Sequence, residues 1–132
     1  MTTHAKGIAE TKNWDEKPYQ EFEGGGKLTN ATVTQAFTGD IEGEGVCEYL
    51  MAYPDENSAN YVALQVVTGK VGGKQGSFVL QVAGGYDGNE ASGTWFVVPG
   101  TGTGELKKLS GEGGFKAPHG SQMHYTLDYD LG

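Results

Sequence analysis

Short runs of Val, Tyr, Phe and Thr recur along this chain, and glycine-rich turns separate them. Branched and aromatic residues favour strands, whereas Gly, Asn, Asp and Pro favour turns. The pattern predicts about eight strands, which cover His4–Trp14, Leu28–Phe37, Gly45–Tyr53, Asn60–Val71, Ser77–Tyr86, Ala91–Val98, Gly111–Lys116 and Met123–Leu131. Only Gly104–Leu109 has the composition of a helical turn.

The order of these segments predicts an all-β fold. Turn sequences such as "VGGK" and "YDGN" join consecutive strands, and such short turns favour antiparallel neighbours. We therefore expect a single closed antiparallel meander β-barrel of about eight strands, with a sandwich as the alternative. A chain of 132 residues is long enough for one core, so one domain is expected over residues 1–132.

The faces of the expected strands differ in polarity. The last strand, "MHYTLDYDL", alternates strictly, which is typical of a strand with one buried and one wet face. In contrast, Asn60–Val71, Ser77–Tyr86 and Ala91–Val98 are apolar on both faces. The barrel interior covers one face only, so these strands predict a homo-oligomer, with a dimer favoured, formed through their outer face.

The turn at Gly72-Gly73 predicts a register for the hairpin around it. A two-residue turn places Leu64 opposite Gln81 and Gln65 opposite Leu80. Opposed residues share a face, so the two glutamines point to opposite sides of the wall.

The glycine-rich stretch "GTGTGELKKLSGEGGF" starts at Gly100 and raises the question of a phosphate-binding loop. A dinucleotide-binding loop needs a long helix after its glycines, and a Walker loop needs G-x-x-x-x-G-K-[ST]. Neither pattern is present, so the glycines are interpreted as sites where strands bend and approach one another closely.

Net charge restricts the expected partners. The chain carries 17 acidic and 9 basic residues, a formal net charge of −8. Such a surface repels phosphate backbones and anionic lipids, so neither a nucleic acid nor a membrane partner is expected. The single Cys47 and the lack of an apolar segment near Met1 predict a cytoplasmic protein. His4, His119 and His124 have no recognised metal spacing, and no metal or other cofactor is expected.

Five residues are candidates for a ligand site. Glu48 alternates with Val46 and Leu50, so it could be a carboxylate on a buried apolar face with a raised pKa. In the alternative arrangement Glu48 faces solvent and the opposite face fills the core with Cys47, Tyr49 and Met51. The remaining candidates interrupt apolar strands or carry large polar aromatic side chains: Gln65, Gln81, Trp95 and Tyr125. Trp14 is expected in the core or in a pocket wall.

Several motifs taken together resemble a known family. "FTGDIEGEG", "EYLMAY", "GSFVLQ", "GTGEL", "LSGEGGF" and "TLDYDL" are similar to those of uncharacterised bacterial proteins of about 130 residues. That family is grouped with the allene oxide cyclase-like β-barrels. The resemblance implies an eight-stranded meander barrel, usually oligomeric, and it implies no activity.

Three functions are compatible with these features. The first is a binding protein that holds one small apolar molecule in, or at the mouth of, the barrel. The second, by analogy with the barrel class, is an isomerase or cyclase. The third is a barrel filled by side chains that acts only through its surface. No catalytic motif is present, so the first is favoured and no catalytic residue is assigned.

Overall fold

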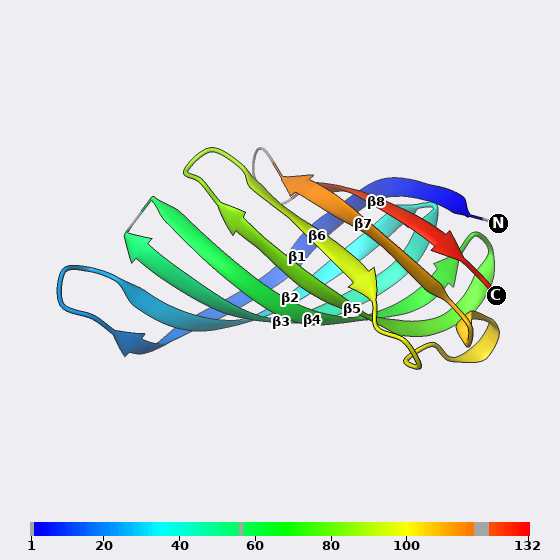
Figure 1. Cartoon of the computed structure of the whole chain (residues 1–132), viewed down its shortest axis with the longest axis horizontal. Coiled ribbons are helices and arrows are strands. Elements are labelled where there is room, and N and C mark those ends of the chain that lie inside the picture. The colour runs from blue at the N-terminus through cyan, green and yellow to red at the C-terminus, as the bar shows by residue number, and fades with distance from the viewer. Residues whose placement is uncertain (1, 56, 118–121) are drawn as a thin grey trace.

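The computed structural model describes residues 2–55, 57–117 and 122–132. Its eight strands form one closed antiparallel barrel, in which each strand pairs with the next and β8 returns to β1 (Figure 1). The strands are β1 (Thr3–Glu21), β2 (Lys27–Gly39), β3 (Ile41–Asp55), β4 (Ser58–Val71), β5 (Lys74–Tyr86), β6 (Ala91–Val97), β7 (Ser110–Ala117) and β8 (Gln122–Asp130). The predicted all-β meander barrel is confirmed.

The expected helical turn is present in shortened form. A 3-10 helix, η1 (Gly104–Leu106), lies in the connection from β6 to β7. No helix in the described part of the chain has the length and apolar character needed to cross a membrane.

The β4–β5 hairpin has the register that the sequence predicts. Gly72 and Gly73 form the two-residue turn with positive φ angles of 57° and 83°, which glycine adopts at little cost. Leu64 lies opposite Gln81, and Gln65 lies opposite Leu80. Gln65 is buried inside the barrel and Gln81 is exposed on its outer surface.

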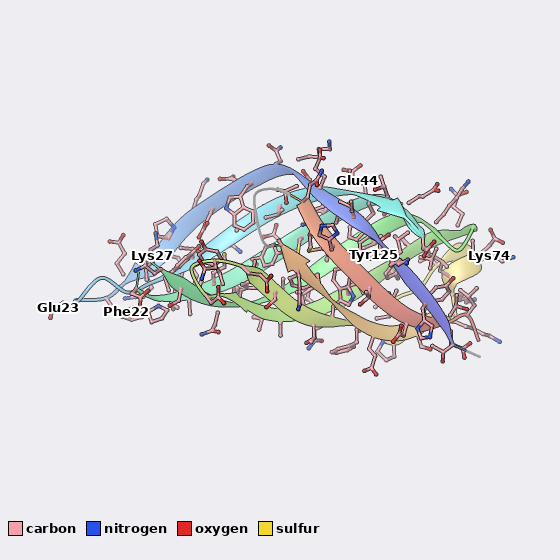
Figure 2. The ribbon with its side chains drawn as sticks, turned by 90° about the horizontal axis from the view of Figure 1, so that it is seen from above. Phe22, Glu23, Lys27, Glu44, Lys74 and Tyr125 are labelled. Carbon is pink, nitrogen blue, oxygen red and sulfur yellow. The ribbon has the colours of Figure 1, made fainter. Side chains whose placement is uncertain are left out.

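The two ends of the barrel are built differently. The chain termini lie at the same end as the β6–β7 connection (Figure 1). There, Leu106 of η1 and Leu109 are both buried in the core and help to close the barrel. The hairpin between β1 and β2, which carries Phe22 and Glu23, projects at the opposite end (Figure 2).

Tyr125 of β8 ties the barrel wall together from the inside. Its hydroxyl accepts a hydrogen bond from the Ile41 amide at 2.9 Å and donates to the Thr38 carbonyl at 2.7 Å. Gly7 makes this possible, because a Cβ atom there would lie only 2.4 Å from the hydroxyl. The bonds join β8 to the turn between β2 and β3.

β1 has two partners along its first half and one along its second. It pairs with β8 from Thr3 to Glu10, whereas its pairing with β2 continues to Glu21. A register shift between Thr11 and Asn13 marks a β-bulge just after the residue at which the pairing of β1 with β8 ends. Beyond the bulge, β1 forms one side of the open end of the barrel.

The outer surface of β3 and β4 is unusually apolar. Five aliphatic side chains there are each 43–55% exposed, namely Val46, Leu50, Val62, Leu64 and Val66. They are neighbours across the β3–β4 ladder, where Val46 pairs with Val66 and Leu50 with Val62. We call these five residues the outer patch.

Candidate ligand-binding cavity

A cavity of about 560 Å³ opens into the barrel at the end opposite the termini. Its described lining consists of Thr11, Trp14, Gln35, Tyr49, Met51, Tyr53, Ala59, Tyr61, Tyr86, Gly88, Asn89, Ala91, Phe115, Ala117 and Met123. The volume lies within the range of about 300–1,000 Å³ that is usual for small-molecule sites. Side chains therefore do not fill the barrel at this end.

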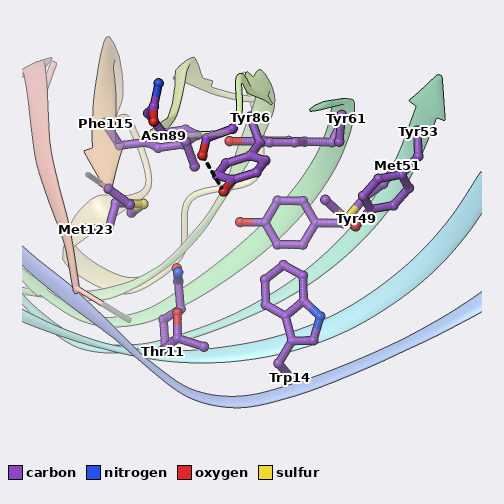
Figure 3. A pocket seen from close by; sticks show the side chains of 15 residues that line it. Thr11, Trp14, Tyr49, Met51, Tyr53, Tyr61, Tyr86, Asn89, Phe115 and Met123 are labelled. Carbon is purple, nitrogen blue, oxygen red and sulfur yellow. Dashed lines mark hydrogen bonds between the residues drawn. The ribbon is translucent and has the colours of Figure 1, made fainter. Parts of the chain in front are cut away.

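Aromatic rings form much of the cavity wall. Tyr49 projects from β3 across the cavity, with Trp14 on one side and Tyr61 and Tyr86 on the other (Figure 3). The rings of Trp14 and Tyr49 stack with centroids 5.8 Å apart. Tyr49 and Tyr61 meet edge to face at 5.3 Å. Such contacts hold the rings in fixed orientations around the space they enclose.

Small residues facing this wall leave the space unfilled. Ala59 of β4, Ala91 of β6 and Ala117 of β7 line the cavity, together with Gly88 of the β5–β6 turn. Tyr86 is fixed beside them, because its hydroxyl donates to the Gly88 carbonyl at 3.0 Å (Figure 3). The cavity thus results from large side chains on some strands and very small ones on others.

The bulge in β1 directs Trp14 and Glu16 towards the inner side. Before the bulge the inward residues are odd-numbered, as in Ala9 and its partner Phe37. After it, Trp14 lies opposite the buried Val33 and Glu16 opposite the buried Ala31. One extra residue reverses the alternation of a strand, so even-numbered residues now face the interior.

Glu16 is held at the rim by three hydrogen bonds. Its carboxylate accepts from the Tyr53 hydroxyl at 2.6 Å, from Thr29 at 2.7 Å and from the Trp14 indole at 3.0 Å. Partial burial disfavours the charged form. The hydrogen bonds and the Lys27 ammonium outweigh that effect, so the pKa of Glu16 lies below its usual value. Glu16 is therefore a carboxylate at neutral pH.

Three of the tyrosines that line the cavity keep their protons at neutral pH. Burial raises the pKa of Tyr61 to about 12, and it also raises the pKa of Tyr49 well above its usual value. For Tyr53, burial together with the adjacent Glu16 carboxylate has the same effect. These hydroxyls are hydrogen-bond donors and acceptors at neutral pH and do not act as phenolates.

A pair of glutamines lies below the cavity. The Gln65 amide donates to the Gln35 side-chain oxygen at 2.8 Å, and Gln35 itself lines the cavity. Gly45 provides the room, because a Cβ atom there would lie 2.5 Å from the Gln65 amide nitrogen. The bond satisfies polar groups that would be costly to bury alone.

The five predicted site residues occupy two different places. Glu48 and Gln81 are exposed on the outer face of the barrel, where Glu48 accepts from Thr32 at 2.8 Å. Gln65, Trp95 and Tyr125 point inside but lie below the cavity rather than on its wall. The alternative arrangement of β3 is the one observed, in which the opposite face is buried: Cys47, Tyr49 and Met51.

Trp95 and Tyr125 support the cavity from below. The Trp95 indole donates to the Thr126 carbonyl at 2.9 Å, and its ring contacts Phe115 of the cavity wall at 5.3 Å. The Trp95 indole nitrogen and the Tyr125 hydroxyl are thus both engaged in hydrogen bonds within the barrel. The residues that sequence reasoning missed are the tyrosines of the wall, namely Tyr49, Tyr53, Tyr61 and Tyr86.

Other reactive side chains lie away from the cavity. Cys47 is a fully buried free thiol, and burial raises its pKa to about 12. His4 bonds to Asp128 on the surface, His124 is exposed, and His119 lies outside the described residues. Within the described ranges, no group of three or more His, Cys, Asp or Glu side chains could hold a metal ion.

Comparison with known proteins places the chain in a family. Residues 5–129 match the family described as "Protein of unknown function (DUF3224)", and the chain belongs to it. A crystal structure of a DUF3224 protein of unknown function from Shewanella oneidensis is 32% identical. The match covers 98% of this chain and 97% of that one, with a TM-score of 0.79. No curated protein matches the sequence.

Proposed function

We propose that this DUF3224 protein binds one small, largely apolar molecule in the cavity at the open end of its barrel. The observation that carries the proposal is the cavity of about 560 Å³, which has six aromatic residues in its described wall. Pockets that combine apolar walls with a few polar groups are the usual small-molecule sites. Thr11, Gln35 and Asn89 are the non-aromatic polar groups that could orient the molecule.

An enzymatic role has less support. General acid–base catalysis requires a group whose pKa lies near the working pH. The pKa of Glu16 is lowered, and its carboxylate is already occupied by three hydrogen bonds, so it is a poor base. The closed eight-stranded meander supports an allene oxide cyclase-like classification, but an isomerase or cyclase would rest on that analogy alone.

Binding can be tested with a neutral fluorescent probe, N-phenyl-1-naphthylamine. The probe should gain fluorescence with a saturable one-to-one isotherm. Ala59→Phe should abolish this gain, because Ala59 is buried in the wall and a phenyl ring there would occupy the cavity. Native mass spectrometry of the freshly purified protein would also report any molecule retained from the cell.

Ala52→Phe is the matched control. Ala52 lies on the exposed face of β3, so the same enlargement there should leave probe binding unchanged. Absence of saturable binding in the wild-type protein would refute the proposal. Equal binding by wild-type and Ala59→Phe proteins would refute the assignment to this cavity.

We further propose that the outer patch pairs two copies of the chain. Five half-exposed aliphatic side chains form one contiguous apolar patch, a feature that on soluble proteins often marks an interaction site. On the outer face, Glu48 and Gln81 flank Leu64 on its two sides. A two-fold axis parallel to β4 would bring Glu48 of one copy opposite Gln81 of the other, a charge-assisted hydrogen bond.

Oligomeric state tests this pairing. Light scattering coupled to gel filtration should give a dimer for the wild-type protein and a monomer for Leu64→Glu. Lys70→Glu, an exposed substitution on the same strand outside the outer patch, should remain dimeric. A wild-type monomer across the micromolar range would refute the proposal.

We also infer a cytoplasmic location, where a single thiol such as Cys47 stays reduced.

A further inference from the structure

We propose that the cavity selects a flat organic cation, an aromatic molecule whose ammonium group lies against the aromatic wall beside Glu16. This inference rests on the proposed binding function and specifies its ligand class. It follows from three observations. Aromatic rings line the cavity, the Glu16 carboxylate accepts hydrogen bonds from two of these aromatic residues, and the Lys27 ammonium already lies over one of the rings.

The aromatic wall supplies the first attraction. Six aromatic residues are among those lining the cavity, and ring faces carry the negative part of the aromatic quadrupole. An ammonium group within about 6 Å of such a face is attracted electrostatically, most strongly by Trp. Trp14 and Tyr49 offer stacked rings, and Tyr61 meets Tyr49 at a right angle. Several faces could therefore contact one cationic group.

Glu16 supplies the second attraction. Trp14 and Tyr53 both line the cavity, and both donate hydrogen bonds to the Glu16 carboxylate. A donor bonded to an anion gains electron density, so these ring faces attract a cation more strongly. The carboxylate also adds its own charge at the rim, where partial burial weakens screening by solvent.

Lys27 shows that one of these rings accepts a cation. Its ammonium nitrogen lies 5.0 Å from the ring centroid of Tyr53. Lys27 is exposed on the hairpin beyond the cavity and is not among the lining residues, so its side chain can be displaced into solvent (Figure 2). We infer that Lys27 competes with a bound cation from outside the cavity, because it already interacts with the Glu16 carboxylate and the Tyr53 ring.

The remaining charges near the rim also favour a cation. The described lining contains no Lys, Arg or His side chain. Asp87 and Glu90 lie on either side of Asn89 in the β5–β6 turn, and the Asp87 side chain accepts from the backbone amides of Asn89 and Glu90. Lys12, next to Thr11, is paired with Glu10. With a formal charge of −8, the whole protein attracts cations and repels anions.

Three probes of similar shape separate the possibilities. (2-Naphthylmethyl)trimethylammonium is the cation, 2-neopentylnaphthalene is its neutral isostere, and 2-naphthylacetate is the anion. Titration calorimetry or naphthalene fluorescence should show the cation binding at least about tenfold more tightly than the isostere at low salt. The advantage should shrink as salt is added. The anion should bind most weakly.

Variants locate the source of the preference. Glu16→Gln should weaken binding of the cation about tenfold and leave the neutral isostere unchanged. Glu112→Gln removes the same charge from the outer face of β7, away from the cavity and from the outer patch, and should change neither. Lys27→Gln removes the competing ammonium and should tighten binding of the cation severalfold. This last variant keeps the test valid if Glu16→Gln proves too unstable to assay.

The outcomes distinguish the two proposals. If the neutral isostere binds as tightly as the cation, the inferred ligand class is wrong and the binding function stands. If Lys27→Gln weakens binding of the cationic probe, the proposed competition by Lys27 is refuted. If none of the three probes binds, both the cation preference and the proposed binding function fail.

Discussion

Replacing Tyr125 by Phe should destabilise the barrel without affecting its cavity. The hydroxyl of Tyr125 is bonded to Ile41 and Thr38 in the turn between β2 and β3, and it lies outside the cavity wall. Ile41 is fully buried, so its amide would lose its partner where water has no access. The change therefore separates a structural hydrogen bond from the proposed ligand site.

The expected cost follows from these contacts. A typical hydrogen bond contributes about 1 kcal/mol net, and an orphaned buried donor adds about 1–3 kcal/mol. Tyr125→Phe should therefore lower the free energy of unfolding by roughly 3 kcal/mol, a large share of the 5–15 kcal/mol of an ordinary domain. Urea unfolding followed by circular dichroism measures the change.

Tyr86→Phe provides the control for this substitution. Its hydroxyl also donates to a carbonyl, that of Gly88, but Tyr86 is 40% exposed and water can replace the lost bond. That variant should lose less than about 0.5 kcal/mol. If Tyr125→Phe loses no more than Tyr86→Phe, the structural role is wrong. If Tyr125→Phe instead weakens binding of the fluorescent probe, Tyr125 belongs to the proposed ligand site.

Two further predictions concern titratable groups. Cys47, which is buried and has a pKa near 12, should not react with iodoacetamide in the native protein and should react rapidly in urea; equal rates would contradict its burial. The folded pKa of Glu16 lies below 4.5, so its contribution to stability is complete well above pH 4.5 and is lost as pH falls through the folded value. Melting temperatures of wild-type and Glu16→Gln proteins should accordingly converge in acid, and a pH-independent difference would refute the bonded carboxylate.

The alternation of apolar and polar residues predicts most of the barrel, because successive side chains of a strand point to opposite faces of the sheet. The Gly72-Gly73 turn was enough to assign the faces of Gln65 and Gln81. Alternation also identified the two possible orientations of β3, although it did not decide between them. The choice depends on which face packs against the rest of the barrel, a property of the assembled structure rather than of one strand.

Alternation fails where a strand is irregular. The sequence gives no sign of the bulge after Thr11, yet that bulge turns Trp14 and Glu16 inward. The expected strand stops at Trp14, whereas β1 continues to Glu21 through a polar segment with low strand propensity. Pairing with β2 outweighs that propensity. The rim carboxylate was missed for these two reasons.

The candidate residues chosen from the sequence were mainly polar residues that interrupt apolar strands. Glu48 and Gln81 were conspicuous for that reason, and both lie on the outer surface. The cavity wall instead contains four tyrosines, a residue type that a sequence pattern usually assigns to the core. Their hydroxyls make tyrosine as suitable for a binding wall as for a core.

The meander itself contains a signal that would have located the cavity. In this topology the carboxyl ends of odd-numbered strands and the amino ends of even-numbered strands meet at one end of the barrel. Tyr53 and Tyr86 near the ends of β3 and β5 therefore meet Tyr61 near the start of β4, together with small residues such as Ala59 and Ala91. The opposite end collects buried apolar side chains, including Ile41, Val71, Phe78, Val97, Leu106 and Leu127. A barrel with large rings facing alanines at one end and aliphatic side chains at the other is expected to be open at the first end and closed at the second, which is the asymmetry observed.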